Sequence, residues 1–485
     1  MTRNGWEPVI GIEVHVELKT ASKMFCSCAV GFGEEPNTSI CPTCLGLPGA
    51  LPVINATAIE WITRIGMAFH CEIAPRSVFH RKNYFYADLP KNYQISQFDH
   101  PICFDGWLDV EVDGEEFRVG IERAHMEEDT GKSLHEGIGG RIHSATSTLL
   151  DFNRSGVPLV EVVSRPDIRS AAQARAYAQE LRSVISELDV SDARMEEGSI
   201  RFDANVSVRP VGTTTLGTKV EIKNMNSFRS LERAVAAEIN RQIALLERGE
   251  RLFQETRHWD EEAGVTKSMR SKEGSSDYRY FAEPDLVPVD IDADMLNQVH
   301  SAMPELPADR RRRYARIGLD AHVVAVLSAA EPGLRQLFTD SVELGADPPT
   351  TANWITGELT GALRRGTATQ ADTGITAMHL TELVGMLTSG QLSSSAGKDV
   401  LQAVLAGRGS PSEVAADLDL IQVSDQAVIA TAVDEVLDAN PDAIERFRSG
   451  EEKVLGFLVG MVMRATKGKA DPKLVNQVLR TKLSS

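Results

Sequence analysis

The sequence predicts an α+β protein in which a part built on an antiparallel sheet is followed by helices alone. Its 485 residues are enough for two to four domains, at roughly 100–200 residues per domain. Of the 28 Phe, Tyr and Trp residues, 23 lie within residues 1–285. That first part contains short segments in which apolar and polar residues alternate, whereas the remainder is rich in Ala, Leu and Val at helical spacing.

Two changes in composition predict the domain boundaries. The segment PDLVPVDIDADML, residues 284–296, ends the strand-rich part, and Asp292 or Asp294 is expected to cap the first helix beyond it. The sequence Gly-Arg-Gly-Ser-Pro at 407–411 is typical of a linker. The helix expected after this linker starts with a Ser-Asp cap and places four apolar residues on one face: Ile429, Val433, Val436 and Leu437. We therefore expect three domains, which span residues 1–294, 295–406 and 407–485.

The net charge, the apolar runs and the cysteine count restrict the class of protein. Lys and Arg number 51 and Asp and Glu 69, which gives a net charge of −18 at pH 7. Any nucleic-acid site must therefore be a local basic patch on an acidic protein. The longest apolar run, residues 454–463, is too short to span a membrane. Six cysteines are too few for a disulfide scaffold, so we expect a cytoplasmic protein without a membrane partner.

The first strand that the sequence predicts, PVIGIEVHVEL at 8–18, alternates strictly. Its apolar residues form one face, which we expect to be buried: Ile10, Ile12, Val14, Val16 and Leu18. The opposite face carries Glu13, His15 and Glu17. Two carboxylates beside an imidazole suit a hard divalent cation better than they suit a solvated surface.

Three further segments extend this pattern. LDVEVDGEEFRVGI predicts a hairpin around Asp113-Gly114, and its second strand leads to His125, Glu127, Glu128 and Asp129. RFDANVSVRP at 201–210 and GTKVEIKNMNSF at 217–228 alternate as well. Their outward residues include Arg201, Asp203, Asn205, Arg209, Lys219, Glu221 and Lys223. Together these strands predict an antiparallel sheet with one polar face, where Mg²⁺ and phosphate groups could bind.

Four of the six cysteines form two close pairs. Cys26 and Cys28 are separated by twelve residues from Cys41 and Cys44. Two such pairs can surround one Zn²⁺ tetrahedrally, and four cysteines leave no open position for water, so the zinc is expected to be structural. Cys71 and Cys103 stand alone and are expected to pack as small apolar residues.

Basic residues gather in two kinds of segment. HRKNYFYADLPKNYQISQFDHP at 80–101 and TRHWDEEAGVTKSMRSKEGSSDYRYFAEPDL at 256–286 mix Lys and Arg with aromatic residues, which suits phosphate binding and base stacking. The final 25 residues carry six Lys and Arg against one acidic residue, which favours contact with a polyanion. Neither a P-loop nor a GxSxG motif occurs: Met126 stands where GxxxxGK[ST] requires Gly.

Several long segments resemble one family over essentially the whole chain. They include GIEVHVELKT, PNTSICPTCLGLPGALPV, RKNYFYADLPKNYQISQ, EEDTGKS, DFNRSGVPLVEVVSRPD, MEEGSIRFDANVSVRP, EIKNMNSFRS, DYRYFAEPDL and ATKGKADPKLVNQVL. In these segments the chain is similar to the B subunits of bacterial aspartyl/glutamyl-tRNA(Asn/Gln) amidotransferases (GatB).

This resemblance implies a cradle domain with a glutamine-synthetase-like fold, an all-α helical domain and a small all-α YqeY-like tail that binds tRNA. It implies a heterotrimer with a glutaminase A subunit and a C subunit. The implied activity is that of a ligase, which uses ATP, Mg²⁺ and ammonia from glutamine to convert Glu-tRNA(Gln) or Asp-tRNA(Asn) to the amide. The four cysteines would hold structural Zn²⁺.

For this reaction we expect specific residues in specific roles. The catalytic candidates are Glu13, His15, Glu128 and Lys82. The Mg²⁺ ligands are expected among Glu13, His15, Glu128 and Glu221, with Glu127 and Asp203 as second choices. The nucleotide is expected to contact Lys82, Lys219, Arg201, Arg209, Lys223 and Asn226, with Asp203 nearby. The tRNA body is expected to contact Arg464, Lys467, Lys469, Lys473, Arg480 and Lys482.

Two other functions fit parts of the sequence. An aminoacyl-tRNA synthetase would also use ATP and tRNA, and TKSMRSKE is a scrambled form of a synthetase loop, but no HIGH motif accompanies it. A non-catalytic zinc-containing RNA-binding protein would explain the cysteines and the basic tail but not the acidic strands.

Overall fold

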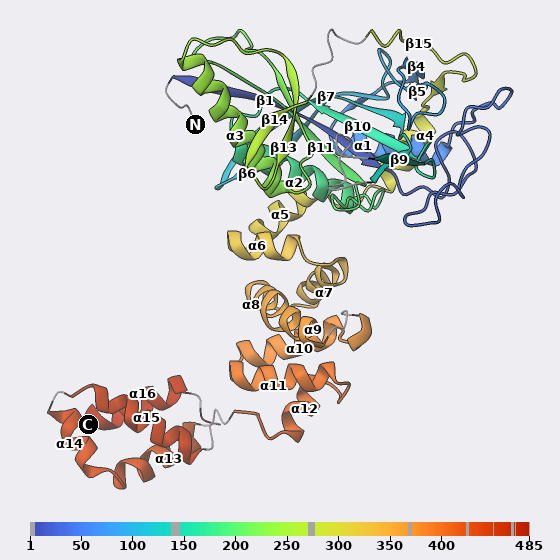
Figure 1. Cartoon of the computed structure of the whole chain (residues 1–485). Helices are drawn as coiled ribbons and strands as arrows, with labels where there is room; N and C mark the ends of the chain where they lie inside the picture. The colour runs from blue at the N-terminus through green and yellow to red at the C-terminus, as the bar shows by residue number, and fades with distance from the viewer. Residues whose placement is uncertain are drawn as a thin grey trace. The chain divides into compact units, whose positions relative to one another are not determined.

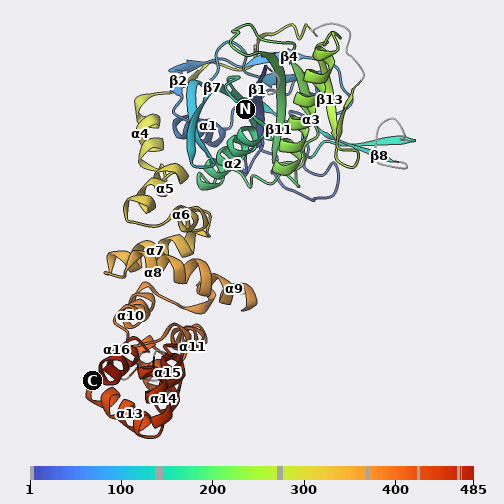
Figure 2. The same cartoon turned by 90° about the vertical axis from the view of Figure 1, so that its left-hand side faces the viewer.

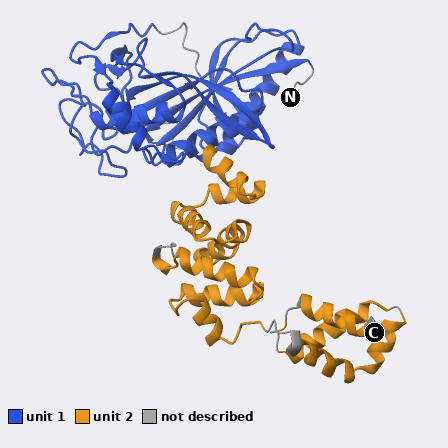
Figure 3. Cartoon of the chain, turned by 180° about the vertical axis from the view of Figure 1, so that it is seen from behind, with its two compact units in different colours: residues 1–307 blue, residues 308–485 orange. Residues whose placement is uncertain are grey.

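The structure is a computed structural model, and it describes residues 5–136, 146–269, 277–366, 371–422, 426–449, 451–466, 470 and 472–484. The chain forms two compact units, residues 1–307 and residues 308–485 (Figure 3). The first unit combines a large sheet with helices, and the described part of the second is helical. The predicted α+β class is therefore confirmed.

A nine-stranded sheet forms the centre of the first unit, in the order β14-β13-β12-β11-β1-β10-β7-β6-β2 (Figure 1). Its neighbouring strands are antiparallel, except that β12 and β13 are parallel. The strands are β1 (Trp6–Glu17), β2 (Glu72–Ile73), β6 (Cys103–Val112), β7 (Glu115–Glu128), β10 (Pro158–Ser164), β11 (Ile200–Pro210), β12 (Val220–Lys223), β13 (Glu255–Asp260) and β14 (Val265–Ser268).

Smaller sheets and four α-helices complete the described part of this unit. The small sheets are formed by β15 (Phe281–Ala282), β4 (His80–Asn83) and β5 (Tyr93–Ser96); by β16 (Val289–Asp290) and β3 (Arg76–Ser77); and by β8 (Lys132–Glu136) and β9 (Ser147–Asp151). The helices are α1 (Ala56–Ala68), α2 (Ala171–Glu187), α3 (Phe228–Glu247) and α4 (Ala293–Ser301). Helices α2 and α3 pack side by side against one face of the large sheet (Figure 2).

The alternation of β1 determines which of its residues are buried beneath these helices. The five apolar residues that the sequence assigned to the core are all at most 1% exposed: Ile10, Ile12, Val14, Val16 and Leu18. On β11, Phe202, Ala204 and Val206 are buried in the same way. Because successive side chains on a strand point to opposite faces, the polar residues of both strands lie together on the other face of the sheet.

The predicted hairpin is also present. Strands β6 and β7 pair from Cys103 to Val112, and the turn between them consists of Asp113 and Gly114 with φ of +54° and +83°. Positive φ at both positions is the geometry of a type I′ turn, for which Asp-Gly is a preferred sequence. This turn sets the register that brings the end of β7 to the polar face.

The helix expected after residue 292 is α4, and the Asp292 side chain caps it by accepting a hydrogen bond from the Met295 N–H at 2.8 Å. Because α4 packs against α1, the first compact unit continues to residue 307 rather than ending at 294. Val414 and Ala415 likewise pack with the preceding helices, beyond the expected boundary at 406. The division into three domains stays a prediction.

The described residues of the second unit form two separate apolar cores. The first is formed by α5 (Pro307–Arg316), α6 (Ala321–Ser328), α7 (Pro332–Glu343), α8 (Pro348–Asn353), the π-helical segment Trp354–Leu359, α9 (Thr360–Gly366), α10 (Ala377–Thr388), α11 (Ser394–Leu405) and α12 (Pro411–Asp417). The second is formed by α13 (Gln426–Asp438), α14 (Pro441–Arg448), α15 (Lys453–Ala465) and α16 (Pro472–Ser484). Helix α13 is the helix predicted after the linker, and the four apolar residues predicted for its buried face all belong to this second core. The expected Ser-Asp cap lies outside the described residues. Within the described chain, no helix has the length and apolar character needed to cross a membrane.

Candidate active site

The polar face of the large sheet brings together residues that are far apart in the sequence. His15 of β1 lies opposite Glu161 of β10 on one side and opposite Arg201 of β11 on the other. Glu161 in turn lies opposite His125 of β7, and Glu13 lies opposite Asp203. Directly opposite residues of an antiparallel pair point to the same face, so these side chains share one surface.

Three side chains on this surface, those of His15, Glu127 and Glu161, could hold a metal ion. The Nε2 atom of His15 lies 3.8 Å from Glu127 Oε1 and 3.8 Å from Glu161 Oε2, and the ligand atoms of the three residues lie within 4.8 Å of one another. Two carboxylates are the ligand number that Mg²⁺ takes from protein when phosphate oxygens and water complete its coordination. The residues therefore fit a divalent cation.

Glu161 is a member of this cluster that the sequence analysis missed. Its segment PLVEVVS is nearly continuous in apolar residues, which hides the one polar residue that alternation places between Val160 and Val162. Burial opposes its ionisation, but His125 at 3.3 Å, His15 and Lys82 hold the pKa of Glu161 well below its usual range. A carboxylate that stays ionised at this depth is suited to bind a cation.

The rest of this face also carries excess negative charge. Burial and then the charge of Glu161 raise the pKa of Glu13, and they outweigh the hydrogen bond that Asn205 Nδ2 donates to Glu13 at 2.8 Å. Lys223 bridges Asp203 at 2.9 Å and Glu221 at 3.0 Å. Burial lowers the pKa of Lys223, but these two carboxylates outweigh it and the pKa is raised. A bound cation would relieve the repulsion that raises the pKa of Glu13.

Lys82 approaches the carboxylates from β4. Burial alone would lower its pKa, but attraction to Glu127 and Glu161 outweighs burial, so the pKa of Lys82 is raised. Its Nζ atom lies 5.3 Å from the ring centre of Tyr278 and 5.9 Å from that of Tyr84. The neighbouring Arg81 anchors the strand, because its Nε donates at 2.6 Å to Glu283, whose side chain is fully buried. Lys82 is thus a fixed cation beside the candidate metal site.

Most of the other predicted nucleotide contacts lie on this face but already have partners. Arg201 donates to Asp129 at 2.7 Å and Arg209 donates to Glu7 at 2.7 Å, while Lys223 bridges Asp203 and Glu221. Lys219 and Asn226 are exposed, Lys219 just before β12 and Asn226 just before α3. The structure therefore places Arg201, Arg209 and Lys223 against carboxylates of this face. Contact with a nucleotide stays a prediction for all five residues.

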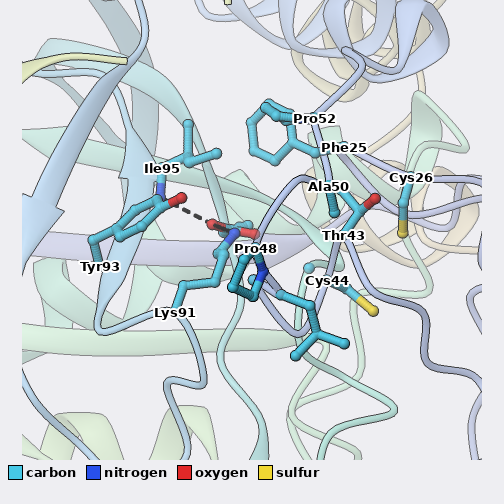
Figure 4. Close-up of a pocket in the computed structure, with 14 residues that line it drawn as sticks. Phe25, Cys26, Thr43, Cys44, Pro48, Ala50, Pro52, Lys91, Tyr93 and Ile95 are labelled. Atoms are coloured by element: carbon cyan, nitrogen blue, oxygen red, sulfur yellow. Dashed lines mark hydrogen bonds and ion pairs between the residues drawn. The ribbon is translucent and has the colours of Figure 1, made fainter. Parts of the chain in front are cut away.

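Three predicted Mg²⁺ ligands lie outside the group of His15, Glu127 and Glu161. Glu13 and Glu221 line the same face of the sheet, whereas Glu128 does not. It follows Glu127 directly on β7, so its side chain points to the opposite face of the strand. There it forms an ion pair with Lys91 and accepts a hydrogen bond from the Ile95 N–H at 3.0 Å. It lines a cavity of about 190 Å³ between Tyr93 and Ile95 on one side and Cys26 and Cys44 on the other (Figure 4). Glu161 takes the place in the cluster that was expected for Glu128.

Glu17, at the end of β1, forms a carboxyl pair with Asp129. Burial and the neighbouring Asp129 raise the pKa of Glu17 to about 8. Burial opposes ionisation of Asp129 as well, but Arg201, Arg154 at 3.6 Å and the hydrogen bond with Glu17 lower its pKa to about 2. One proton is therefore held on Glu17 and shared with Asp129 near neutral pH.

This pair predicts a pH dependence of stability. The folded protein holds the Glu17 proton more tightly than the unfolded chain, where the pKa is near 4.5. The stabilisation is fully present below pH 4.5 and is lost as the pH rises through about 8, by at most about 1.4 kcal/mol per pH unit. We expect Glu17→Gln to reduce the slope of the free energy of unfolding between pH 5 and pH 8.

The measurement is urea denaturation in EDTA at several pH values, followed by tryptophan fluorescence. Four of the five tryptophans lie in the first compact unit. Glu197→Gln, which changes a half-buried carboxylate paired with Arg194 at 2.6 Å, serves as the control. Equal slopes in wild type and Glu17→Gln would contradict the shared proton.

The four cysteines predicted to bind zinc lie together. Their Sγ atoms are all within 4.8 Å of one another, and a tetrahedral Zn²⁺ with bonds of about 2.3 Å needs sulfur atoms about 3.8 Å apart. The thiols already interact: the hydrogen bond with Cys44 raises the pKa of Cys26, and the same bond lowers the pKa of Cys44 to about 5. The donor set fits zinc.

The basic residues predicted to bind tRNA lie on the last two helices. Arg464 lies in the last turn of α15 and is exposed. Lys473 and Arg480 are exposed as well, and they share a face of α16 because they are seven residues apart. Lys482 is half-buried and pairs with Asp434 at 2.5 Å. Lys467 and Lys469 lie outside the described residues. Contact with tRNA stays a prediction for all six.

Comparison with known proteins extends over the whole chain. The family model described as the GatB/GatE catalytic domain matches residues 8–297, and the one described as the GatB domain matches residues 336–483. A relative from Moorella thermoacetica, named as the B subunit of an aspartyl/glutamyl-tRNA(Asn/Gln) amidotransferase, is 50% identical over 480 residues, which cover 99% of this chain and 100% of the relative. Relatives with the same name from Frankia casuarinae and Salinispora tropica are 50% and 49% identical, and their alignments cover 99% of this chain and 96% of each relative. The chain therefore belongs to the GatB family, the B subunits of aspartyl/glutamyl-tRNA(Asn/Gln) amidotransferases.

Proposed function

We propose that this chain is the B subunit of a tRNA-dependent amidotransferase and that the polar face of its large sheet activates the side-chain carboxylate of a tRNA-bound residue. The activated residue is the glutamate of Glu-tRNA(Gln) or the aspartate of Asp-tRNA(Asn), and the product is Gln-tRNA(Gln) or Asn-tRNA(Asn). Full-length similarity to proteins named as B subunits supports the reaction. The carboxylate cluster of His15, Glu127 and Glu161 beside Lys82 supports the location.

Activation of a carboxylate by ATP can be catalysed by carboxylates, lysines and arginines alone. A carboxylate is a poor electrophile, because its oxygen is a poor leaving group. Phosphoryl transfer from ATP forms a bond between that oxygen and the γ-phosphorus and breaks the bond between the γ-phosphorus and the β,γ-bridging oxygen. The products are an acyl phosphate and ADP. Ammonia then attacks the carbonyl carbon and phosphate leaves, which forms the amide. Such transfer depends on positioning and charge neutralisation and needs no covalent nucleophile from the protein.

The residues on this face of the sheet form groups, and each group has its own task in the reaction. His15, Glu127 and Glu161 would hold Mg²⁺, which neutralises charge on the phosphates when bound. Lys82 neutralises charge that develops on the transferred phosphoryl group from the side of β4. Glu13, Asp203, Glu221 and Lys223 line the same face, where they would orient the nucleotide together with Arg201, Arg209, Lys219 and Asn226.

The remaining parts of the chain are assigned accordingly. Residues 1–294 form the catalytic cradle, residues 295–406 a helical domain and residues 407–485 a YqeY-like tail. The exposed basic residues of α15 and α16 would contact the tRNA body. The four cysteines would hold a structural zinc ion, and an A subunit with glutaminase activity would supply ammonia in a heterotrimer with a C subunit.

The proposal is tested with the chain co-expressed with its A and C subunits. We expect conversion of Glu-tRNA(Gln), Asp-tRNA(Asn) or both to the amide, with a strict requirement for ATP. Hydrolysis of ATP should depend on the mischarged tRNA and should not respond to the same tRNA without its amino acid. Running the two mischarged tRNAs side by side determines which route the enzyme serves.

The same assay separates the alternatives. A synthetase-like enzyme would consume ATP with uncharged tRNA and free amino acid, and a non-catalytic RNA-binding protein would bind tRNA without ATP turnover. Either result, obtained with the complete heterotrimer, would overturn the proposal.

A further inference from the structure

Lys23 is a buried lysine that the proposed reaction does not use. Its relative exposure is 0%, in the segment that leads into the first cysteine pair. Its backbone is fixed on both sides, since its N–H donates to the Cys28 carbonyl at 2.9 Å and its carbonyl accepts from Asn55 Nδ2 at 3.3 Å. Burial of an ammonium group in a protein interior is unfavourable unless a negative charge and hydrogen-bond acceptors compensate it.

The three acceptors around the Lys23 ammonium group show what compensates it. The Nζ atom donates to the Ser39 carbonyl at 2.8 Å, to the Phe152 carbonyl at 3.4 Å and to Cys44 Sγ at 3.8 Å. An ammonium group has three N–H donors, so these acceptors account for all of them. Among the described residues, no carboxylate oxygen lies within 4.0 Å of Nζ. Cys44 is therefore the only one of the three acceptors that can carry a negative charge.

The four-cysteine site, when it holds zinc, carries a negative charge that a nearby cation would compensate. Four thiolates around Zn²⁺ carry a formal charge of −2, which water can partly solvate at Cys26, Cys28 and Cys41, because these residues are half-buried. Cys44 is 3% exposed, so its sulfur depends on partners from the protein. Those partners are the Cys41 N–H at 3.1 Å and Lys23. Lys23 thus lies against the side of the site that water does not reach.

We propose that Lys23 is a built-in counter-cation of the four-cysteine site, which neutralises part of the charge of the zinc tetrathiolate at Cys44 and joins it to the loops at Ser39 and Phe152. Groups that contact metal ligands in this way orient them and set the affinity of the metal. The inference rests on the zinc site within the proposed function and is independent of the amidation reaction.

The test measures zinc affinity of the full-length chain by competition with a chromophoric chelator at fixed pH. Lys23→Gln keeps N–H donors for the two carbonyls and removes the charge, so we expect zinc to bind about 10–100-fold more weakly. Lys23→Arg keeps the charge and should lie within a few-fold of wild type. Lys19→Gln is the matched control, because it removes a lysine that pairs with the exposed Asp189 at the surface, and it should leave the affinity unchanged.

Cobalt substitution gives a second readout that does not depend on affinity. The charge-transfer band from sulfur to Co²⁺ should move to longer wavelength in Lys23→Gln, because the sulfur electrons of Cys44 lose a stabilising positive charge. An unchanged band and unchanged zinc affinity in a folded Lys23→Gln variant would overturn the inference.

If Lys23→Gln does not fold, the inference is tested by the zinc affinity of Lys23→Arg. A folded Lys23→Arg variant with near wild-type affinity supports a role for charge, and a hundredfold loss contradicts it. A wild-type chain that binds no zinc would overturn the zinc site itself, whatever the result of the amidation assay.

Discussion

Replacing Glu161 by glutamine is expected to lower tRNA-dependent ATP hydrolysis and amide formation by about a thousandfold, the upper range for removal of one group that stabilises transition-state charge. Glutamine has nearly the same shape but no charge, so the change removes one of the two carboxylates that lie 3.8 Å from His15 Nε2. It also removes the charged partner of His125. The substitution should therefore weaken binding of the divalent cation as well as turnover.

Both effects are measured on the proposed complex of this chain with its A and C subunits, with Mn²⁺ binding followed by electron paramagnetic resonance. Glu122→Gln is the matched control, since Glu122 lies on β7, three residues before His125, but its side chain is 53% exposed. Hydrolysis of glutamine in the absence of ATP should be unaffected in both variants, because the proposal assigns it to the A subunit. Full activity with normal Mn²⁺ binding in Glu161→Gln would exclude Glu161 from the metal site.

Local pattern was sufficient to predict the sheet and one of its faces. The alternation of β1 correctly assigned its apolar residues to the core and Glu13, His15 and Glu17 to the polar face. It could do so because a side-chain period of two is a property of the strand itself. The same rule separates Glu127 from Glu128, and applied to β7 it would have shown that both could not face the same cation. The assignment of Glu128 to the cluster treated neighbouring residues as one group, and the strand geometry corrects it.

Other features depend on contacts between distant segments and have no local signal. The pairing of β1 with β10 brings Glu161 to His15 across more than a hundred residues of sequence, and its register is determined only by the assembled sheet. The ion pair between Arg201 and Asp129 likewise joins β11 to the end of β7. Sequence reasoning could identify Arg201 as a basic residue on a polar face. It could not show that a carboxylate already binds it.

Replacing Lys82 by methionine is expected to lower turnover by about a hundredfold while the divalent cation binds as tightly as in wild type or more tightly. The two effects differ in sign because Lys82 interacts with the same carboxylates that the cation needs. Its charge is attracted to Glu127 and Glu161, so removing it leaves those carboxylates with a more negative potential. Phosphoryl transfer nevertheless loses a fixed cation beside the transferred group.

This opposition distinguishes a catalytic cation from a merely structural one. If Lys82 only held β4 in place, Lys82→Met would disturb the cluster and weaken Mn²⁺ binding together with turnover, as Glu161→Gln does. Lys398→Met, which breaks a surface ion pair with Glu358 at 2.6 Å, controls for the loss of a lysine. Lys82→Arg should recover part of the turnover, since it restores a cation on a strand that Arg81 and the buried Glu283 keep in position. Parallel losses of metal affinity and turnover in Lys82→Met would therefore reject direct action on the phosphoryl group, whereas opposite changes place the Lys82 charge in the transfer step itself.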